Sequence, residues 1–249
     1  MSQSDAFDSL ADLYDVLTDW DRRLPREVGF LAEILQKAEI KTVLDAACGT
    51  GAHLVALEEA GFDVAGADIS PRMVERSRLR LGEGATLAVT GFSDLPDHLP
   101  PRDAVLVLGN SLPVAGSEEA VREGLRGLAN SVSPGGLLIL HFMNFAALQG
   151  QGGGLRPMRE VREGPRRHIF LKLFEVESGK VVLHVIALSW MRDEVSQQHF
   201  RSELWPIEWP WLKAELEALG LTVERTTGGF DRTPFDVETS GDLLVIARK

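Results

Sequence analysis

Several residue types that define other protein classes are scarce in this sequence. Its single cysteine, Cys48, excludes an internal disulfide and a multi-cysteine zinc site, and it fits a reducing compartment. Basic residues number 26 against 37 acidic ones, and the formal net charge of −11 disfavours binding along a nucleic-acid backbone. No apolar run approaches the roughly 20 residues that span a bilayer, and residues 1–8 are polar and acidic, unlike a signal peptide. We therefore expect a cytoplasmic protein without a metal site, a nucleic-acid partner or a membrane contact.

Thr42 to Leu54 is the most informative stretch. An apolar run ends at Asp45, glycines follow at 49 and 51, and a helix-like run begins at Thr50 or Gly51. The helix N-terminus offers free N–H groups to an anion, whereas the carboxylate of Asp45 attracts a cation. A ligand that satisfies both carries the two charges together, as the amino-acid end of S-adenosylmethionine does. A dinucleotide site is the alternative, although Leu54 stands where G-x-G-x-x-G needs its third glycine.

A second acid follows at the end of the next expected strand. Apart from Asp63, residues 62–67 are apolar or small, and they lead to Asp68, about 20 residues beyond the glycine turn, where a carboxylate can accept hydrogen bonds from ribose hydroxyls. A helix N-cap is the alternative role for Asp68, but Ser70 and Pro71 already supply the cap and the first helical position. Ribose binding does not distinguish NAD from S-adenosylmethionine.

Two further polar residues follow later strands. Asn110 comes after the apolar run 103–108, and His141 ends the run 137–141, so both are expected at the carboxyl edge of a parallel sheet. An amide at 110 can orient a donor, and a neutral imidazole at 141 can accept a proton from a substrate nucleophile. The alternatives are turn chemistry for Asn110, which precedes Ser111 and Pro113, and a structural role for His141.

The second half of the chain differs in pattern. Residues 149–154 are rich in glycine and predict a flexible hinge or loop. Alternating residues then predict three antiparallel strands over 166–176, 180–190 and 197–205, which form a roof over the sheet edge or an oligomer interface. The arginines around them, which could bind a substrate carboxylate, are Arg156, Arg159, Arg166, Arg167 and Arg201. Two final strands, 221–226 and 242–248, have no helix between them and predict an antiparallel hairpin.

Two segments resemble a known family. Leu44-Asp45-Ala46-Ala47-Cys48-Gly49-Thr50-Gly51 resembles motif I of class I S-adenosylmethionine-dependent methyltransferases, and Leu108 to Ser111 resembles the strand-four ending of glycine and sarcosine N-methyltransferases. The resemblance implies a Rossmann-like, doubly wound α/β sheet of seven strands with an antiparallel last strand. On this basis residues 1–249 form one methyltransferase domain, in which residues 1–40 are a helical cap, broken at Leu24-Pro25, and residues 150–205 are an inserted β lid.

The resemblance also assigns roles to residues. Tyr14 would close over the cofactor, and Phe92 would contact adenine. Gly91 stands where the family has an acid that reaches the adenine amino group, and Ser93 and Asp94 are candidates to replace that acid. The candidate catalytic residues are His141, Asn110 and Tyr14. The candidate cofactor-binding residues are Asp45, Ala47, Gly49, Gly51, Asp68, Ile69, Phe92, Ser93, Leu108 and Gly109.

The sequence therefore predicts an enzyme that moves a methyl group from S-adenosylmethionine to a small-molecule acceptor. An amine or amino acid is preferred because a neutral amine needs little help from a base, whereas a hydroxyl acceptor would need one, with His141 as the candidate. An NAD(P)-dependent oxidoreductase and a non-catalytic S-adenosylmethionine-binding protein are the alternatives. A homodimer is left open.

Overall fold

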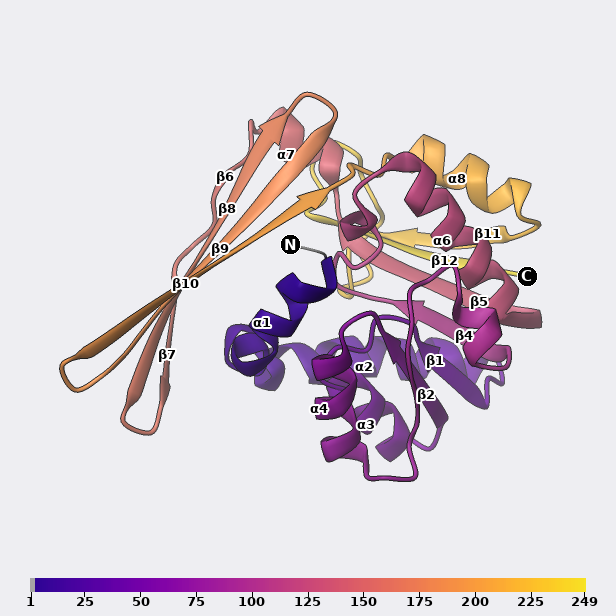
Figure 1. Cartoon of the computed structure of the whole chain (residues 1–249). Coiled ribbons are helices and arrows are strands. Elements are labelled where there is room, and N and C mark those ends of the chain that lie inside the picture. The colour runs from indigo at the N-terminus through magenta and orange to yellow at the C-terminus, as the bar shows by residue number, and fades with distance from the viewer. Residues whose placement is uncertain (1–2) are drawn as a thin grey trace.

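A seven-stranded sheet in the order β3-β2-β1-β4-β5-β12-β11 forms the centre of the molecule (Figure 1). The computed structural model describes residues 3–249, with the side chains of residue 8 and of residues 10–249. The strands of this sheet are β1 (Thr42–Asp45), β2 (Asp63–Asp68), β3 (Thr86–Val89), β4 (Arg102–Val107), β5 (Val132–Met143), β11 (Thr222–Thr227) and β12 (Asp242–Arg248). Strands β1 to β5 pair in parallel, whereas β12 runs antiparallel to both β5 and β11. The predicted doubly wound sheet with an antiparallel last strand is thereby confirmed.

Helices cover both faces of this sheet, so its central strands are buried on both sides. Val105, Leu106 and Val107 of β4 are at most 1% exposed and face alternate layers. One layer contains α2 (Trp20–Lys37), α3 (Ala52–Glu59) and α4 (Pro71–Leu81). The other contains α5 (Leu95–His98), α6 (Glu118–Ser131), α7 (Phe145–Gly150) and α8 (Trp209–Ala218), and a short 3₁₀ helix, η1 (Pro113–Ala115), follows β4.

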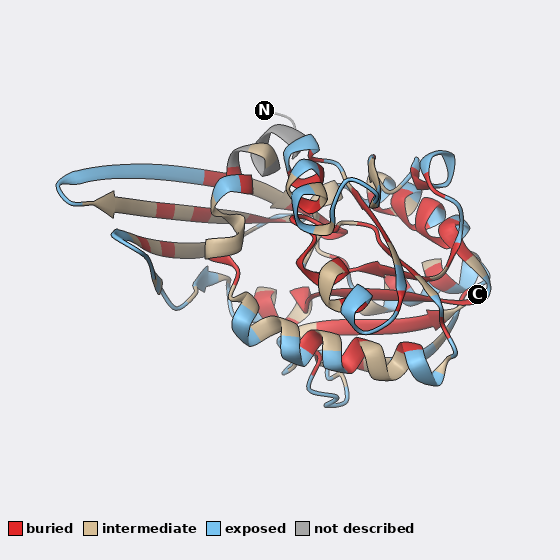
Figure 2. Cartoon of the chain, turned by 90° about the horizontal axis from the view of Figure 1, so that it is seen from below, coloured by how far each residue is buried: buried red, intermediate tan, exposed pale blue. Residues whose placement is uncertain are grey.

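A second, antiparallel sheet projects from the body, and its far end is exposed (Figures 1 and 2). Its strands are β6 (Gly154–Leu155), β7 (Arg159–Glu163), β8 (Arg166–Glu177), β9 (Lys180–Met191) and β10 (Glu194–Leu204). The three long strands match the predicted ones, whereas the short β6 and β7 give too little alternation to be predicted. Helix α1 (Gln3–Leu17) packs Leu10 and Leu17 against Phe170 and Phe200 of this sheet, so the sheet is anchored to the N-terminal helices.

One local prediction was wrong. The break between the N-terminal helices lies at residues 18–19, and Pro25 is inside α2, where packing of Phe30 and Leu35 stabilises the helix despite the missing N–H of the proline. The glycine-rich stretch ends α7 and leads through a short turn into β6, and a Cβ on Gly153 would lie 2.4 Å from the carbonyl oxygen of Phe174; its predicted role as a flexible hinge or loop stays a prediction. Within residues 3–249, no helix is both long and apolar enough to cross a bilayer.

Candidate functional site

The glycine turn after β1 is built as the sequence predicts. Gly49 (φ +54°) and Gly51 (φ +81°) adopt the left-handed conformation that glycine accommodates best. A Cβ on Gly51 would lie 2.7 Å from the hydroxyl of Ser77, whose Oγ–H donates to the carbonyl of Gly49 over 2.8 Å. Helix α4 therefore presses against the turn and fixes it, and α3 begins directly behind it.

Asp45 lies at the carboxyl end of β1 and is 1% exposed. The backbone N–H of Ala47 donates to its Oδ1 over 3.4 Å, a long contact. Burial raises the pKa of Asp45 above its ordinary value, while His53 and the Ala47 N–H oppose the shift. A buried carboxylate with such weak hydrogen bonding is stabilised in its charged form by a cationic ligand group.

Asp68 ends β2 next to the turn. Its Oδ2 accepts the N–H of Gly49 and its Oδ1 the N–H of Ser70, each over 2.9 Å. Burial raises the pKa of Asp68 to about 6, although these two hydrogen bonds lower it. The N-cap of α4 is Ser70, whose side chain accepts a hydrogen bond from the N–H of Met73. Asp68 is therefore not needed as a cap, and its residue lines the cavity.

A cavity of about 230 Å³ opens beside these residues. The predicted site residues that line it are Tyr14, Ala47, Gly49, Asp68, Ile69, Phe92 and Ser93. The others lie nearby in the fold: Asp45 and Gly51 are buried in and beneath the turn, and Leu108, Gly109, Asn110 and His141 follow β4 or end β5. Their roles stay predictions, but the fold brings all of them to one edge of the sheet.

The far end of the cavity contains an acid that sequence reasoning missed. Glu123 of α6 lines it together with Gly91, Phe92 and Ser93, whereas Asp94 is not among the lining residues. Glycine at position 127 allows α6 to come this close, because a Cβ there would lie 1.9 Å from the carbonyl oxygen of Phe92. Since the contact depends on how α6 packs, no local motif signals it.

The N-terminal helices close over the turn. Asp15 accepts hydrogen bonds from the hydroxyl of Thr50 over 2.6 Å and from the indole of Trp20 over 2.8 Å. It also pairs with Arg80 of α4 over 2.8 Å. The adjacent Tyr14 lies against the turn, with its ring 3.5 Å from the position of a Cβ on Gly49, and burial raises its pKa. Tyr14 is thus a wall of the cavity, as a residue that closes over a ligand must be.

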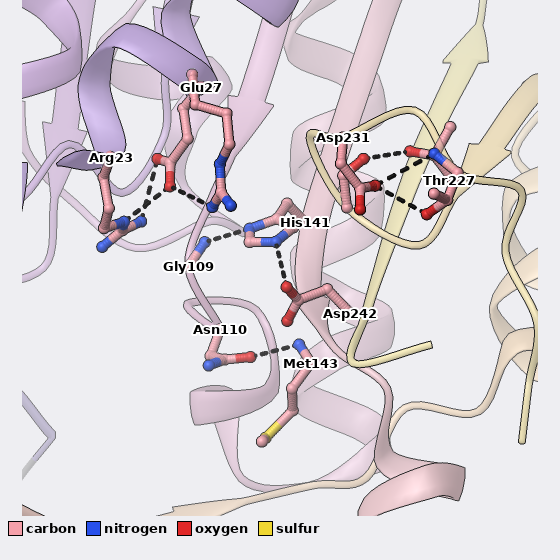
Figure 3. A network of polar contacts seen from close by, with 12 residues as sticks. Arg23, Glu27, Gly109, Asn110, His141, Met143, Thr227, Asp231 and Asp242 are labelled. Atoms are coloured by element: carbon pink, nitrogen blue, oxygen red, sulfur yellow. Dashed lines mark hydrogen bonds and ion pairs between the residues drawn. The ribbon is translucent and has the colours of Figure 1, made fainter. Parts of the chain in front are cut away.

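An ion-pair network ties α2 to the helix behind the glycine turn, and Figure 3 shows its Arg23–Glu27 part. Glu27, 1% exposed, accepts two hydrogen bonds from Arg23, over 2.8 and 3.1 Å, and its Oε2 lies 2.9 Å from Nε2 of His53. Burial raises the pKa of Glu27, but the hydrogen bonds with His53 and Arg23 outweigh it and lower the pKa to about 2. No local pattern signals this network because its members are distributed over two helices.

Asn110, His141 and a residue that was not predicted, Asp242, lie near one another at the same edge of the sheet, although none is among the residues that line the cavity (Figure 3). Asn110 has φ +71° and its Oδ1 accepts the N–H of Met143 over 2.7 Å. Nδ1 of His141 lies 3.4 Å from the backbone N of Gly109, and its Nε2 lies 3.7 Å from Oδ2 of Asp242. Asp242 is the first residue of β12. Because β12 runs antiparallel to β5, its first residue lies next to the carboxyl end of β5.

Comparison with known proteins agrees with this geometry. A family model described as a methyltransferase domain matches residues 43–136, from β1 into β5. The chain is 31% identical to the cypemycin N-terminal methyltransferase of a Streptomyces species, and the match covers 100% of both chains. The chain belongs to the class I S-adenosylmethionine-dependent methyltransferases.

Other relatives of this methyltransferase match in part. A glycine/sarcosine N-methyltransferase from Halorhodospira halochloris is 36% identical over 149 residues, which cover 58% of this chain and 56% of that protein. The methyltransferase spans little more than half the length of these first relatives. An amino pentose methyltransferase from Micromonospora echinaspora, solved with S-adenosylmethionine bound, has a TM-score of 0.77 at 20% identity and covers 95% of this chain and 97% of that one, which shows the shared fold.

The site of the methyltransferase fits S-adenosylmethionine, the cofactor of its family. The weakly bonded carboxylate of Asp45 beside the glycine turn suits a zwitterionic end. Asp68 presents a carboxylate to the cavity, as a diol requires. The apolar and acidic groups at the far end, Phe92 and Glu123, suit an adenine ring with its amino group.

Proposed function

We propose that this protein transfers the methyl group of S-adenosylmethionine to the amine of a small molecule in the cytoplasm. The observation that carries the proposal is that Asp45, the glycine turn and Asp68 lie together at one sheet edge, beside a single continuous cavity. A net charge of −11 supports a small acceptor in preference to a nucleic acid.

The residues present would hold the cofactor along the cavity. Asp45 would pair with its ammonium, and the N–H groups of the glycine turn and of α3 would face its carboxylate. Asp68 would bind the ribose, with Ile69 beside it. Phe92 and Ser93 would surround the adenine, and Glu123 takes the place of the acid that Gly91 replaces.

The bound cofactor supplies a methyl carbon that is already electrophilic because it is attached to a sulfonium. An acceptor nitrogen would donate its lone pair to that carbon, and the carbon–sulfur bond would break with its electron pair retained by sulfur. The nitrogen becomes positively charged and then loses a proton to solvent. The protein contributes alignment at about 3 Å and exclusion of water, to which the wall formed by Tyr14 and the N-terminal helices is suited.

A lysine on the second sheet favours an acceptor with an anionic group, such as an amino acid. Lys172 lies between Phe170 and Phe174 on β8 and shares their face of the sheet, the face that packs on α1. Burial, with the charges of Arg23 and Arg159, lowers its pKa. Among the described residues no carboxylate pairs with its ammonium. A half-buried, unpaired cation is stabilised by a ligand anion.

Three of the five arginines named for the lid have partners within the protein. Arg167 pairs with Glu160, Arg201 with Glu203, and Arg159 donates to the carbonyl of Leu17. They therefore hold the second sheet together or to the helices, which supports a lid that presents Lys172 to the acceptor.

Calorimetry followed by a transfer assay tests the proposal. S-adenosylmethionine and S-adenosylhomocysteine should bind and NAD should not. Tritium from labelled S-adenosylmethionine should then appear on at least one amine among glycine, sarcosine and a peptide with a free N-terminus. Binding of NAD alone would refute the cofactor, and cofactor binding without transfer to any amine would indicate a binding protein or a different acceptor class.

A further inference from the structure

The polar groups at the acceptor end differ in what they can still bind. Asn110 uses its side-chain oxygen on the N–H of Met143, which pairs with Asp242 across β5 and β12 (Figure 3). The hydroxyl of Ser111 donates to the carbonyl of Leu108. Both oxygens keep acceptor lone pairs, but neither carries the negative charge that would stabilise a cation developing on nitrogen.

His141 is oriented as a donor at its buried nitrogen. Its Nδ1 faces the N–H of Gly109, so the lone pair lies on Nδ1 and the proton on Nε2. The imidazole is 10% exposed, it packs on Phe230 at a centroid distance of 4.6 Å, and within the described chain its Nε2 has no hydrogen-bond partner. Proton uptake at Nδ1 would set two N–H groups against each other, so His141 is poorly placed to act as a base.

Asp242 is the group towards which that N–H points. Its Oδ2 lies 3.7 Å from Nε2, beyond hydrogen-bond length, and its side chain is 46% exposed. Of the other acids, Glu27 is bonded to Arg23 and His53, and Asp45 and Asp68 are the carboxylates assigned to the cofactor. Within the described chain, the carboxylate of Asp242 thus accepts no hydrogen bond from another side chain, and it lies beside His141 where β12 begins next to the end of β5.

We propose that Asp242 binds the acceptor amine and that His141 is a positioning residue, whose Nε2–H attracts the carboxylate of Asp242 over 3.7 Å. The inference rests on the proposed function, because it assumes that nitrogen is methylated. As the nitrogen–carbon bond forms, positive charge develops on nitrogen, and a fixed carboxylate beside it stabilises that charge more in the transition state than in the neutral amine. The exposed side of Asp242 also lets the proton leave to solvent.

Binding of two matched ligands tests the role of Asp242. The probe is sarcosine, and its control is methoxyacetate, in which oxygen replaces the N–H group; both are titrated into protein saturated with S-adenosylhomocysteine. The wild type should prefer sarcosine, and Asp242→Asn should lose that preference by about tenfold or more. Asp193→Asn, the same change in the exposed β9–β10 turn, should retain it, and all three proteins should bind S-adenosylhomocysteine equally.

Each contrary result has a distinct meaning. An unchanged preference in Asp242→Asn, or no preference in the wild type, overturns the amine role while leaving cofactor chemistry intact. Absence of S-adenosylhomocysteine binding refutes the proposed function itself. For His141, ¹⁵N NMR should show the proton on Nε2 in the wild type, and His141→Phe should raise KM for the amine several-fold more than it lowers kcat. A proton on Nδ1 would overturn the positioning role.

Discussion

The carboxylate of Asp68 accepts a hydrogen bond from the backbone N–H of Gly49 over 2.9 Å, so one acid both faces the cavity and fixes the glycine turn. Asp68→Asn keeps one acceptor oxygen and loses the charge and the second acceptor. We expect its dissociation constant for S-adenosylhomocysteine to rise by about 10- to 100-fold, measured by calorimetry. Asp97→Asn, on the exposed face of α5, should leave it unchanged. Equal affinity in both variants would refute the ribose role.

The same acid makes cofactor-free stability depend on pH. The pKa of Asp68 is raised by burial to about 6, above the value of about 4 in an unfolded chain. The folded state therefore binds this proton more tightly, and the contribution of Asp68 to the free energy of unfolding falls as pH rises from about 4 to about 6, by up to about 3 kcal/mol. Asp68→Asn lacks this pH dependence. Its free energy of unfolding, measured by denaturant titration, should therefore rise relative to that of the wild type across the same pH interval. A constant difference would contradict the raised pKa.

The two glycines of the turn should respond differently to alanine. Both have positive φ, which strains any other residue by about 1 kcal/mol. A Cβ on Gly51 would also lie 3.1 Å from the Cα of Ser77, whereas on Gly49 the nearest atom is the ring of Tyr14 at 3.5 Å. Gly51→Ala should lower the free energy of unfolding by about 1–2 kcal/mol more than Gly49→Ala, measured by denaturant unfolding. Equal losses would mean that α4 yields to the extra methyl group.

Sequence patterns predicted the parts of the molecule whose signals are local. The apolar run ending at Asp45 and the glycines after it specify a strand and a turn within a dozen residues. No helix was expected between residues 226 and 242. A connection without a helix joins two strands as a hairpin, and this predicted the antiparallel pairing of the last two strands. Alternation over 166–205 predicted the long strands of the second sheet for the same reason.

The groups that sequence reasoning missed depend on packing between distant elements. Glu123 reaches the cavity because glycines let α6 approach Phe92. Asp242 reaches His141 because β12 pairs antiparallel with β5, and Lys172 lies on a sheet whose position is set by α1. Each is an ordinary polar residue in its own segment. Only the tertiary arrangement separates it from other charged residues of the chain.

Glu123 provides a test of the adenine end. It is the acid of α6 that lines the cavity, where Gly91 leaves no side chain to bind an amino group. We expect Glu123→Gln to weaken S-adenosylhomocysteine binding by about 5- to 20-fold, as loss of a charge-assisted hydrogen bond does. Glu119→Gln, one turn earlier on the exposed face of α6, is the matched control and should bind normally. If both variants bound like the wild type, Ser93 or the backbone would have to hold the adenine.

Glu27 anchors the N-terminal helices to the body. Its pKa is lowered to about 2 because hydrogen bonds with His53 and Arg23 outweigh the effect of burial. Since this pKa lies below that of an unfolded chain, the stabilisation is present above about pH 4.5 and is lost as pH falls through about 2. Glu27→Gln leaves Arg23 and His53 without their charged partner and should lower the free energy of unfolding at pH 7 by about 3 kcal/mol in denaturant titrations.

The control for Glu27 lies on the same helix. Glu33 pairs with Lys37 and Arg232 at the surface, where solvent screens the ion pairs, so Glu33→Gln should lower the free energy of unfolding far less than Glu27→Gln does. Because His53 begins α3 directly behind the glycine turn, the loss in Glu27→Gln should be accompanied by weaker S-adenosylhomocysteine binding, which Glu33→Gln should not show. Equal stability of the two variants would mean that burial does not strengthen the ion pairs of Glu27. Other contacts, such as the hydrogen bond between Asp15 and Thr50, would then have to hold the N-terminal helices over the cavity.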